Sequence, residues 1–437
     1  MLHTLALSLR ILVVLAFTVY AIRRRSLTAW IFASMIIGIE LGMDAPHVAL
    51  KTRVLADIFL RLIKTIVAPL ILTTLISGIA GHGNLKDVGR LGLKTILYFE
   101  FVTTFALAIG LIAINISKAG IGVGTPEQTH AVAAASGSAI PTATSAISWS
   151  QTLLHLFPEN LAKSIAEGQV IQVVIFALLF GIALSGMAEP QRSTVLHFVD
   201  AVGVVMFRFT NFVMLFAPVG VGAAMASTVG QMGVGFLLNC GRLLLTLYGA
   251  LLVFMFLVLL PLSLIARVPI RRFCKAVLEP ATIAFATSSS EAALPTAMES
   301  MEQLGVSRRI VAFVIPTGYS FNLTGSTLYL TLATVFTAQA AGIHLAIGQQ
   351  LFILLVLMIA SKGVAGVARG TFIVLMATLP GFGLPVWPLM LIFGIDVLMD
   401  MGRTVTNLIG NCQAAVVMAI WEKEFHLSPE TTPATIE

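Results

Sequence analysis

The chain has 437 residues, of which 58% are hydrophobic and only 11% carry a charge. A soluble domain carries about 25% charged residues, so this chain has too little polar surface to cover a water-soluble fold. Lys and Arg outnumber Asp and Glu by 26 to 20, an excess that a membrane protein places in its cytoplasmic loops. The composition excludes a cytosolic enzyme, a disordered protein and a nucleic-acid binder. It predicts an all-α polytopic membrane protein.

The N-terminal segment is apolar but does not follow the pattern of a cleaved leader. Residues 2–22 are interrupted only by Arg10 and precede the triplet Arg23 to Arg25. They fit an extra helix, an uncleaved signal anchor or a helix on the membrane surface. Cleaved signal peptides place positive charge before the apolar run, and here the charge follows it. Residues 1–26 are therefore expected to form an apolar N-terminal extension.

Six apolar stretches then follow, each long enough to cross a hydrocarbon core of about 30 Å as a helix. They are residues 27–45, 54–80, 92–114, 169–187, 203–226 and 235–266. Basic residues precede the first stretch, separate the second from the third and follow the sixth, so these loops are expected in the cytoplasm. Residues 119–150 and 227–234 carry almost no charge and are expected outside.

Beyond about residue 276 the apolar segments become short and are broken by small polar clusters. Interrupted segments in corresponding positions are typical of transporter binding sites. The pattern predicts two re-entrant hairpins, each followed by a long helix, in an order that suggests an inverted repeat: residues 276–306, 309–341, 347–380 and 385–421. The alternative is that the polar clusters are ordinary loops outside the membrane.

The last predicted helix carries six polar residues on one face, because they recur at intervals of three and four: Asp396, Asp400, Arg403, Thr404, Asn407 and Asn411. Ionisable residues inside a membrane helix suggest a functional site. The guanidinium offers a planar fork for a carboxylate, and Asp400 an acceptor for an ammonium group. Backbone N–H groups at the hairpin tips favour a second carboxylate. The face therefore predicts an acidic amino acid as ligand; the alternative is a purely structural Asp400–Arg403 ion pair.

Four motifs in this order resemble the dicarboxylate/amino acid:cation symporters, the family that includes the glutamate transporters. They are residues 286–295 (Ala-Thr-Ser-Ser-Ser-Glu-Ala-Ala-Leu-Pro), 316–322 (Pro-Thr-Gly-Tyr-Ser-Phe-Asn), 361–367 (Ser-Lys-Gly-Val-Ala-Gly-Val) and 396–411. The resemblance covers about residues 27–425. It implies a homotrimer in the lipid bilayer, with eight transmembrane helices and two re-entrant hairpins in each copy.

The resemblance also implies that different parts of the chain form different functional units. Residues 27–266 would form helices 1–6, a scaffold that holds the trimer, with helices 3 and 6 contributing to a mobile transport core. Residues 270–421 would form that core, and residues 422–437 a cytoplasmic tail. The protein is expected to be a multi-pass protein of a bacterial inner membrane.

The substrate contacts of the family fall on residues of the hairpins and the last helix. Arg403 matches the arginine that takes the side-chain carboxylate of the substrate, and Asp400 matches the aspartate that takes its amino group. The remaining expected contacts are Thr404, Asn407, Ser288, Ser289, Ser290, Val367 and Thr371, of which Ser289 and Val367 match the two hairpin-tip contacts. Members that carry only C4 dicarboxylates tend to lack an aspartate at position 400.

The chain departs from the family at the cation sites. Sodium-coupled members have carboxylates where this chain has Thr324, two residues after Asn322, and where it has Asn411; Phe99 replaces a tyrosine. Hard cations prefer oxygen ligands and negative charge, so two sodium sites are weakened. A third site, built partly from hairpin carbonyl groups, could survive. The departures favour proton over sodium coupling.

Two carboxylates are candidate proton carriers, Asp396 and Glu100, because burial in a low-dielectric site favours the protonated form. For Glu100 the alternative is an ion pair with a nearby base such as Lys94. Arg369 stands in the second hairpin tip, where many relatives have glycine. It could seal the gate, touch a carboxylate or reach water.

The sequence thus predicts a secondary-active symporter that imports L-glutamate or L-aspartate with a cation, by an elevator movement. The alternative is a C4-dicarboxylate symporter coupled to sodium or protons. An intramembrane serine enzyme is disfavoured because no histidine lies near the hairpin serines, and a dedicated channel would not need the Asp400–Arg403 pair. No metal-binding or cofactor motif is present, so H+ or Na+ is the only small partner expected besides the substrate.

Overall fold

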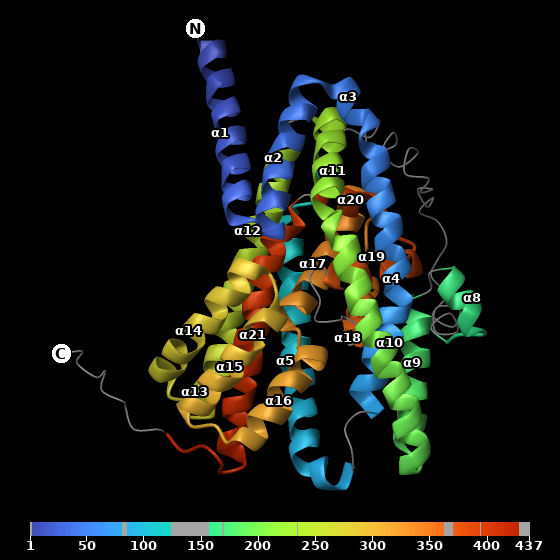
Figure 1. Ribbon diagram of the computed structural model, residues 1–437, viewed down its shortest axis with the longest axis vertical. Coiled ribbons are helices and arrows are strands. Elements are labelled where there is room, and N and C mark those ends of the chain that lie inside the picture. Colours follow the sequence, from blue (N-terminus) through green and yellow to red (C-terminus); the bar gives the residue numbers. More distant parts are fainter. Residues whose placement is uncertain are drawn as a thin grey trace, which may run out of the picture.

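The computed structural model describes residues 2–80, 85–123, 157–167, 170–233, 235–361, 370–393 and 395–427. Within these ranges the chain is helical apart from its turns and one isolated bridge between Val306 and Phe425. The long helices form an elongated bundle (Figure 1). Its first half contains α1 (Leu2–Arg24), α2 (Leu27–Asp44), α3 (Pro46–Lys51), α4 (Arg53–Ala80), α5 (Leu85–Ser117), α8 (Leu161–Ala166), α9 (Val170–Ser185), α10 (Glu189–Leu215) and α11 (Ala217–Met232).

The second half begins with α12 (Gly235–Phe254), which continues through a π-helical turn (Met255–Leu259) into α13 (Leu260–Ile265). It then contains α14 (Ile270–Thr287), α15 (Ser290–Leu304), α16 (Arg308–Phe321), α17 (Thr324–Ala340), α18 (Ile347–Ala360), α19 (Gly370–Thr378), a 3-10 turn (Leu379–Phe382), α20 (Trp387–Phe393) and α21 (Asp396–Trp421).

Several helices have the length and composition of membrane spans. Among the described residues, four stretches qualify: Arg90–Ser117, Glu189–Leu215, Leu237–Ile265 and Asp396–Trp421. Their outer surfaces are apolar, and Leu238 and Leu245 on α12 leave 78% and 76% of their area exposed. Such surfaces are stable against lipid and not against water. The chain is an integral membrane protein built of helices, as its composition predicts.

Helices α2 and α11 pack through small residues. A Cβ atom on Gly38 would lie 2.2 Å from the carbonyl oxygen of Gly222, and one on Gly42 would lie 2.8 Å from that of Ala226. Membrane helices have no hydrophobic driving force between them, so close backbone approach at small residues is what holds them together. The spacing of four between Gly38 and Gly42 repeats along α11, where Gly222, Ala226 and Gly230 face them.

The fifth predicted span differs from its expected bounds of residues 203–226. Helix α10 begins at Glu189, and α11 extends to Met232. Pro218 lies in the first turn of α11, and its missing N–H accounts for the break after Leu215. The prediction of an outside loop at residues 227–234 is wrong for residues 227–232, because this helical segment packs against α2 and α3.

Helices α14 and α15 form the first hairpin, which starts at Ile270 rather than at residue 276. Ser288 turns the chain with a left-handed backbone (φ 50°), and Ser289 caps α15 by accepting a hydrogen bond from the backbone N–H of Ala292 at 3.3 Å. The two limbs pack against each other and against α21. The serine cluster is therefore a turn between two helices that both contact the last helix.

The helix predicted over residues 309–341 is interrupted. Helix α16 ends at Phe321 and α17 begins at Thr324, with Asn322 and Leu323 outside helical geometry. Helix α17 is buried on all sides between α5 and α21. The second predicted hairpin covers α18 and α19, and residues 362–369 between these helices lie outside the described residues. The expected positions of Val367 and Arg369 therefore lie there too.

The small-residue seam between α2 and α11 gives a direct test of the packing. Gly38→Leu should lower the free energy of unfolding by about 1–3 kcal/mol, because the side chain must push the two backbones apart. Gly249→Leu, on α12 where no atom lies within 4 Å of the new Cβ, is the matched control and should change it little. Thermal unfolding of detergent-purified protein measures both. Equal midpoints for the two variants would contradict the seam.

Candidate functional site

The six polar residues predicted to share a face lie on one continuous helix, α21, and all six are buried. Six neighbouring helices pack against this helix: both limbs of the first hairpin (α14 and α15), the interrupted pair α16 and α17, α12 and α5. Regular spacing of the polar residues along an unbroken helix places them in a row. Helix α17 and the interruption before it supply partners for parts of that row.

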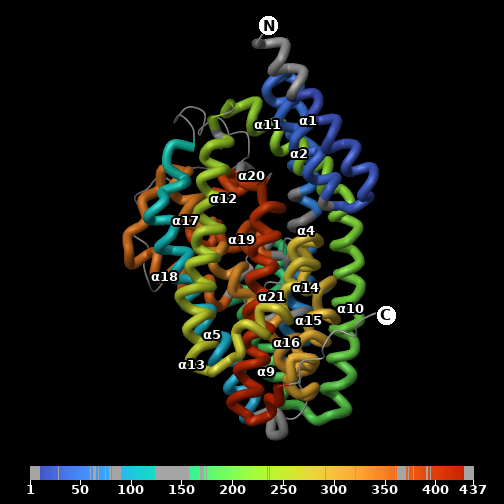
Figure 2. Tube along the Cα trace, turned by 90° about the vertical axis from the view of Figure 1, so that its left-hand side faces the viewer, coloured from blue at the N-terminus to red at the C-terminus, as the bar shows by residue number. Residues whose placement is uncertain are grey.

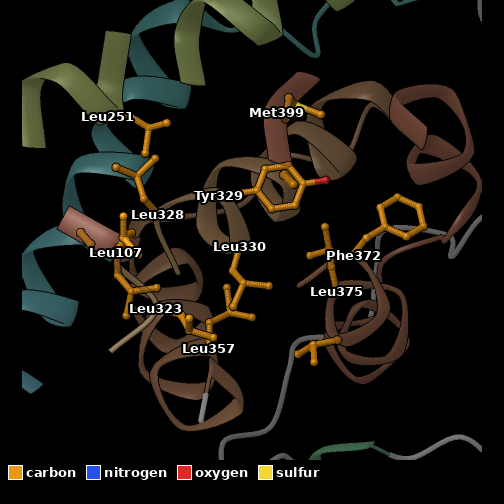
Figure 3. Packing of buried hydrophobic residues seen from close by; sticks show 14 of the residues in the cluster. Leu107, Leu251, Leu323, Leu328, Tyr329, Leu330, Leu357, Phe372, Leu375 and Met399 are labelled. Carbon is orange, nitrogen blue, oxygen red and sulfur yellow. The ribbon is translucent and has the colours of Figure 1, made fainter. Parts of the chain in front are cut away.

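Arg403 is the centre of this row. Its Nη2 donates a hydrogen bond to Asp400 Oδ1 at 2.8 Å and a second to Asp396 Oδ1 at 3.1 Å, and its side chain is fully buried. The guanidinium carbon lies 3.9 Å from the centre of the Tyr329 ring, a cation–π contact from α17. Figure 3 shows that ring between Met399 on one side and Leu330 and Leu375 on the other. The ion pair of the structural alternative is thus present, but it is part of a larger network.

The network leaves polar atoms without partners inside the described structure. Arg403 Nε and Nη1 are buried and make no hydrogen bond there. Buried polar groups are almost always satisfied, so a cluster of unsatisfied ones indicates a ligand, a proton or water. Two carboxylates and one guanidinium also sum to a charge of −1 in a low-dielectric interior. The site is therefore prepared for an anion on the guanidinium and a positive charge near the carboxylates.

Asn407 is held by the start of α17. Its Oδ1 accepts hydrogen bonds from the backbone N–H groups of Gly325 (2.8 Å) and Ser326 (3.2 Å), and its Nδ2 donates to Ser326 Oγ at 3.0 Å. A Cβ on Gly325 would lie 2.5 Å from the carbonyl oxygen of Arg403, so only glycine allows this approach. These bonds fix the amide orientation and leave one N–H of Nδ2 for another partner.

The interruption between α16 and α17 lies against Asn411. Asn322 Nδ2 donates to Asn411 Oδ1 at 2.9 Å, and both residues are buried. Asn322 Oδ1 and Thr324 Oγ1 are buried without a hydrogen-bond partner among the described residues. Two amides and a hydroxyl thus lie together at this interruption. The oxygens are present, but none of them carries a charge.

Several of the predicted substrate contacts are buried in the described structure. Ser288 and Ser290 are buried, and the Ser288 hydroxyl has no hydrogen-bond partner within the described chain. Thr371, in the first turn of α19, is buried, as is Thr404 on α21.

Glu100 lies on α5, half-buried, beside the buried ring of Phe99. Lys94, the possible partner of Glu100, donates a hydrogen bond to Glu422 at the end of α21. This hydrogen bond, more than any other cause, holds the pKa of the Glu422 carboxyl below its usual value. It ties α5 to the end of the site helix.

Sequence reasoning missed two residues that shape the site, Tyr329 and Ser326. Both lie on α17, which is buried on all sides and therefore shows no amphipathic period that would single them out. The sequence contains five tyrosines, and nothing local distinguishes Tyr329 from the others. The usable signal for Ser326 was its place directly after the interruption, at a helix start.

Comparison with known proteins agrees with this geometry. Residues 27–421 match the model of the Sodium:dicarboxylate symporter family. The chain is 41% identical over 406 residues to the "Proton/sodium-glutamate symport protein" of Geobacillus stearothermophilus, covering 91% of this chain and 95% of the relative. It is 42% identical over 404 residues to the protein of that name from Bacillus subtilis, covering 92% and 94%. It is 41% identical over 410 residues to the "C4-dicarboxylate transport protein" of Solibacter usitatus, covering 94% and 95%.

The fold and the matches define a membrane transporter that moves its substrate together with a cation, and not an enzyme. The chain belongs to the Sodium:dicarboxylate symporter family. The resemblance drawn from its four motifs is confirmed.

The charge network predicts that two variants lose different amounts of stability. Arg403→Leu should lower the free energy of unfolding by about 3–5 kcal/mol, because two buried carboxylates lose their counter-ion. Arg403→Leu combined with Asp396→Asn should recover part of that loss, since one of the uncompensated charges is gone. Thermal unfolding of the substrate-free protein in detergent compares them. A double variant no more stable than the single one would contradict the network.

Proposed function

We propose that this symporter imports acidic amino acids, L-glutamate or L-aspartate, together with protons. The observation that carries the proposal is the buried Asp400–Arg403 pair, whose guanidinium keeps Nε and Nη1 without partners in the described structure. A side-chain carboxylate on these nitrogens and an ammonium on Asp400 would satisfy both charges. Relatives at similar identity are named for glutamate and for C4-dicarboxylate transport, so the residues of the site must decide between them.

The remaining contacts of the proposed site come from three elements. Thr404 and the free N–H of Asn407 lie on the same row of α21 as the charged pair. Ser288, Ser289 and Ser290 would supply hydroxyl and backbone donors from the first hairpin to the second carboxylate of the substrate. Val367 and Thr371 would close the site from the second hairpin.

Charge balance favours an amino acid over a dicarboxylate. Succinate brings two negative charges and no positive one, so its second carboxylate would face Asp400 without a cation between them. Glutamate and aspartate bring an ammonium for that position. A C4-dicarboxylate would bind here only with Asp400 protonated, and this keeps the dicarboxylate symporter as the second candidate.

The same charge balance supports proton coupling. A substrate carboxylate on Arg403 Nε and Nη1 would add a negative charge to a buried site that already holds two carboxylates, and protonation of one of them would restore the charge balance. Asp396 is fully buried and bonds Arg403, whereas Glu100 is half-buried on α5, so Asp396 is the first candidate carrier and Glu100 the second. The side chains of Thr324, Asn322 and Asn411 carry no negative charge that would help to bind sodium.

We further propose the architecture of eight transmembrane helices with two re-entrant hairpins in inverted repeats, assembled as a homotrimer in the inner membrane. The α14–α15 hairpin and the interruption at Asn322 support it. Residues 27–266 would form the scaffold with helices 3 and 6 assigned to the moving part, residues 270–421 would form the transport core that moves as an elevator, and residues 422–437 a cytoplasmic tail.

The substrate assignment is tested at Asp400. Asp400→Ser should weaken L-aspartate transport by about 30-fold or more, because loss of a buried charge partner costs at least about 2 kcal/mol. Succinate inhibition should weaken far less or improve, since no ammonium contact is lost. Competition against labelled L-aspartate uptake measures both, and Asp57→Ser on α4, outside the site, is the control. Equal losses for the two ligands would show that the assigned role of Asp400 is wrong.

A further inference from the structure

Helix α1 lies outside the residues that the family model matches, which begin at Leu27. It runs antiparallel to α2 at the edge of the molecule in both views (Figures 1 and 2). Its extensive contacts within the described chain are with α2 alone. Neither the family fold nor the site explains its presence, so its own contacts must indicate its role.

An ion cluster joins the two helices far from their connecting turn. Arg10 donates from Nε to Glu40 Oε2 at 2.7 Å and from Nη2 to Asp44 Oδ1 at 2.8 Å. Arg10 also donates from Nη2 to Glu40 Oε2. At about 1.5 Å of rise per residue, Arg10 lies about 20 Å along α1 from Arg23 at its other end. That distance is shorter than the hydrocarbon core of about 30 Å.

A second contact near the turn is a seam of small residues. Ala21 on α1 and Ala29 and Ala33 on α2 are buried against one another. Small residues allow close approach of two helices where no hydrophobic force operates between them, which is the usual packing in lipid. The seam and the ion cluster together hold α1 against α2 along much of its length.

From Arg10 onwards, where the side chains of α1 are described, its outer face is apolar. Leu12 and Leu15 expose 63% and 58% of their area. Between Arg10 and Tyr20 the polar side chain is Thr18, whose hydroxyl donates to the carbonyl oxygen of Val14 at 2.8 Å. At the turn, Arg24 lies over the Tyr20 ring, and Tyr and Arg are the residues that mark the cytoplasmic membrane interface.

We propose that α1 is an additional transmembrane helix, fastened to α2 inside the membrane by the Arg10–Glu40–Asp44 cluster, with lipid acyl chains covering its outer face. The arginine triplet keeps the α1–α2 turn in the cytoplasm, and the N-terminus lies on the opposite side. The chain then crosses the membrane once more than the family pattern. Lipid is the proposed occupant because the exposed face between Arg10 and Tyr20 has no polar group that needs a hydrogen-bond partner. A second copy of the chain would be held there by shape complementarity alone.

The ion cluster neutralises a charge on each of the two helices. Glu40 on α2 would be an unpaired carboxylate at the membrane, and Arg10 on α1 an unpaired guanidinium; either one alone is costly in lipid. Pairing makes each tolerable only while the other is present. This reciprocity explains why a peripheral helix with no part in the site is bound by charge to the scaffold.

Topology is the first test. In a background without Cys240, Cys274 and Cys412, a cysteine in a short tag before Met1 should react with a membrane-impermeant maleimide in intact cells. His426→Cys, beyond the last helix, should react only after the cells are lysed. Labelling of both positions only after lysis would overturn the proposal, because α1 would then lie on the cytoplasmic surface.

Charge exchange is the second test, and it remains informative if single variants fold poorly. Arg10→Glu and Glu40→Arg should each lower the thermal midpoint of the protein in lipid nanodiscs, and the double exchange should restore most of the loss. Arg309→Glu with Glu424→Arg, an ion pair outside the membrane, is the matched control and should change little in any combination. Additive losses in the Arg10–Glu40 double variant would overturn the intramembrane pairing. A crosslink from Leu12→Cys to a second copy would overturn lipid as the occupant.

Discussion

Burying the charge of Arg403 is the constraint on which the rest of the site depends. A fully buried guanidinium needs opposite charges at hydrogen-bond distance, because an unpaired ion in the interior costs several kcal/mol. Asp396 and Asp400 supply them from the two preceding turns of the same helix. The Tyr329 ring covers one face of the guanidinium, and it reaches that face only because Gly325 lets α17 approach the backbone of α21.

In the described structure the two aspartates balance the charge of Arg403. The substrate carboxylate is proposed to bind the same guanidinium during transport. Binding would thus be linked to charge movement, because the arriving carboxylate adds a negative charge to a site that already holds two carboxylates, and that added charge needs a cation. Asn322 and Asn411 form a neutral amide pair. They add no charge that could balance the site, so the balancing charge must come from elsewhere. Proton movement on a carboxylate is then the simplest way to keep the site balanced.

Periodicity and motif order sufficed to predict much of this site. The row from Asp396 to Asn411 and the serine turn at Ser288 follow from spacing and small polar clusters. The interruption at Asn322 lies inside a segment that the pattern predicts as one helix, residues 309–341. Tyr329 could not be predicted, because a helix buried on every side shows no face. The glycine contacts of Gly38 depend on which helices become neighbours, and a single sequence does not contain that information. The same reason hid the Lys94–Glu422 bond, whose partners are far apart in the chain.

The central claim is that substrate binding at Arg403 is balanced by a proton. The most direct measurement is accumulation of labelled L-aspartate in vesicles of the purified protein, driven by an inward proton gradient without sodium or by an inward sodium gradient at equal pH. Accumulation with protons alone, lost in Asp396→Asn and retained in Glu100→Gln, is the result predicted here. Accumulation that requires sodium would mean that a cation site works without charge at Thr324 and Asn411, and would contradict the account.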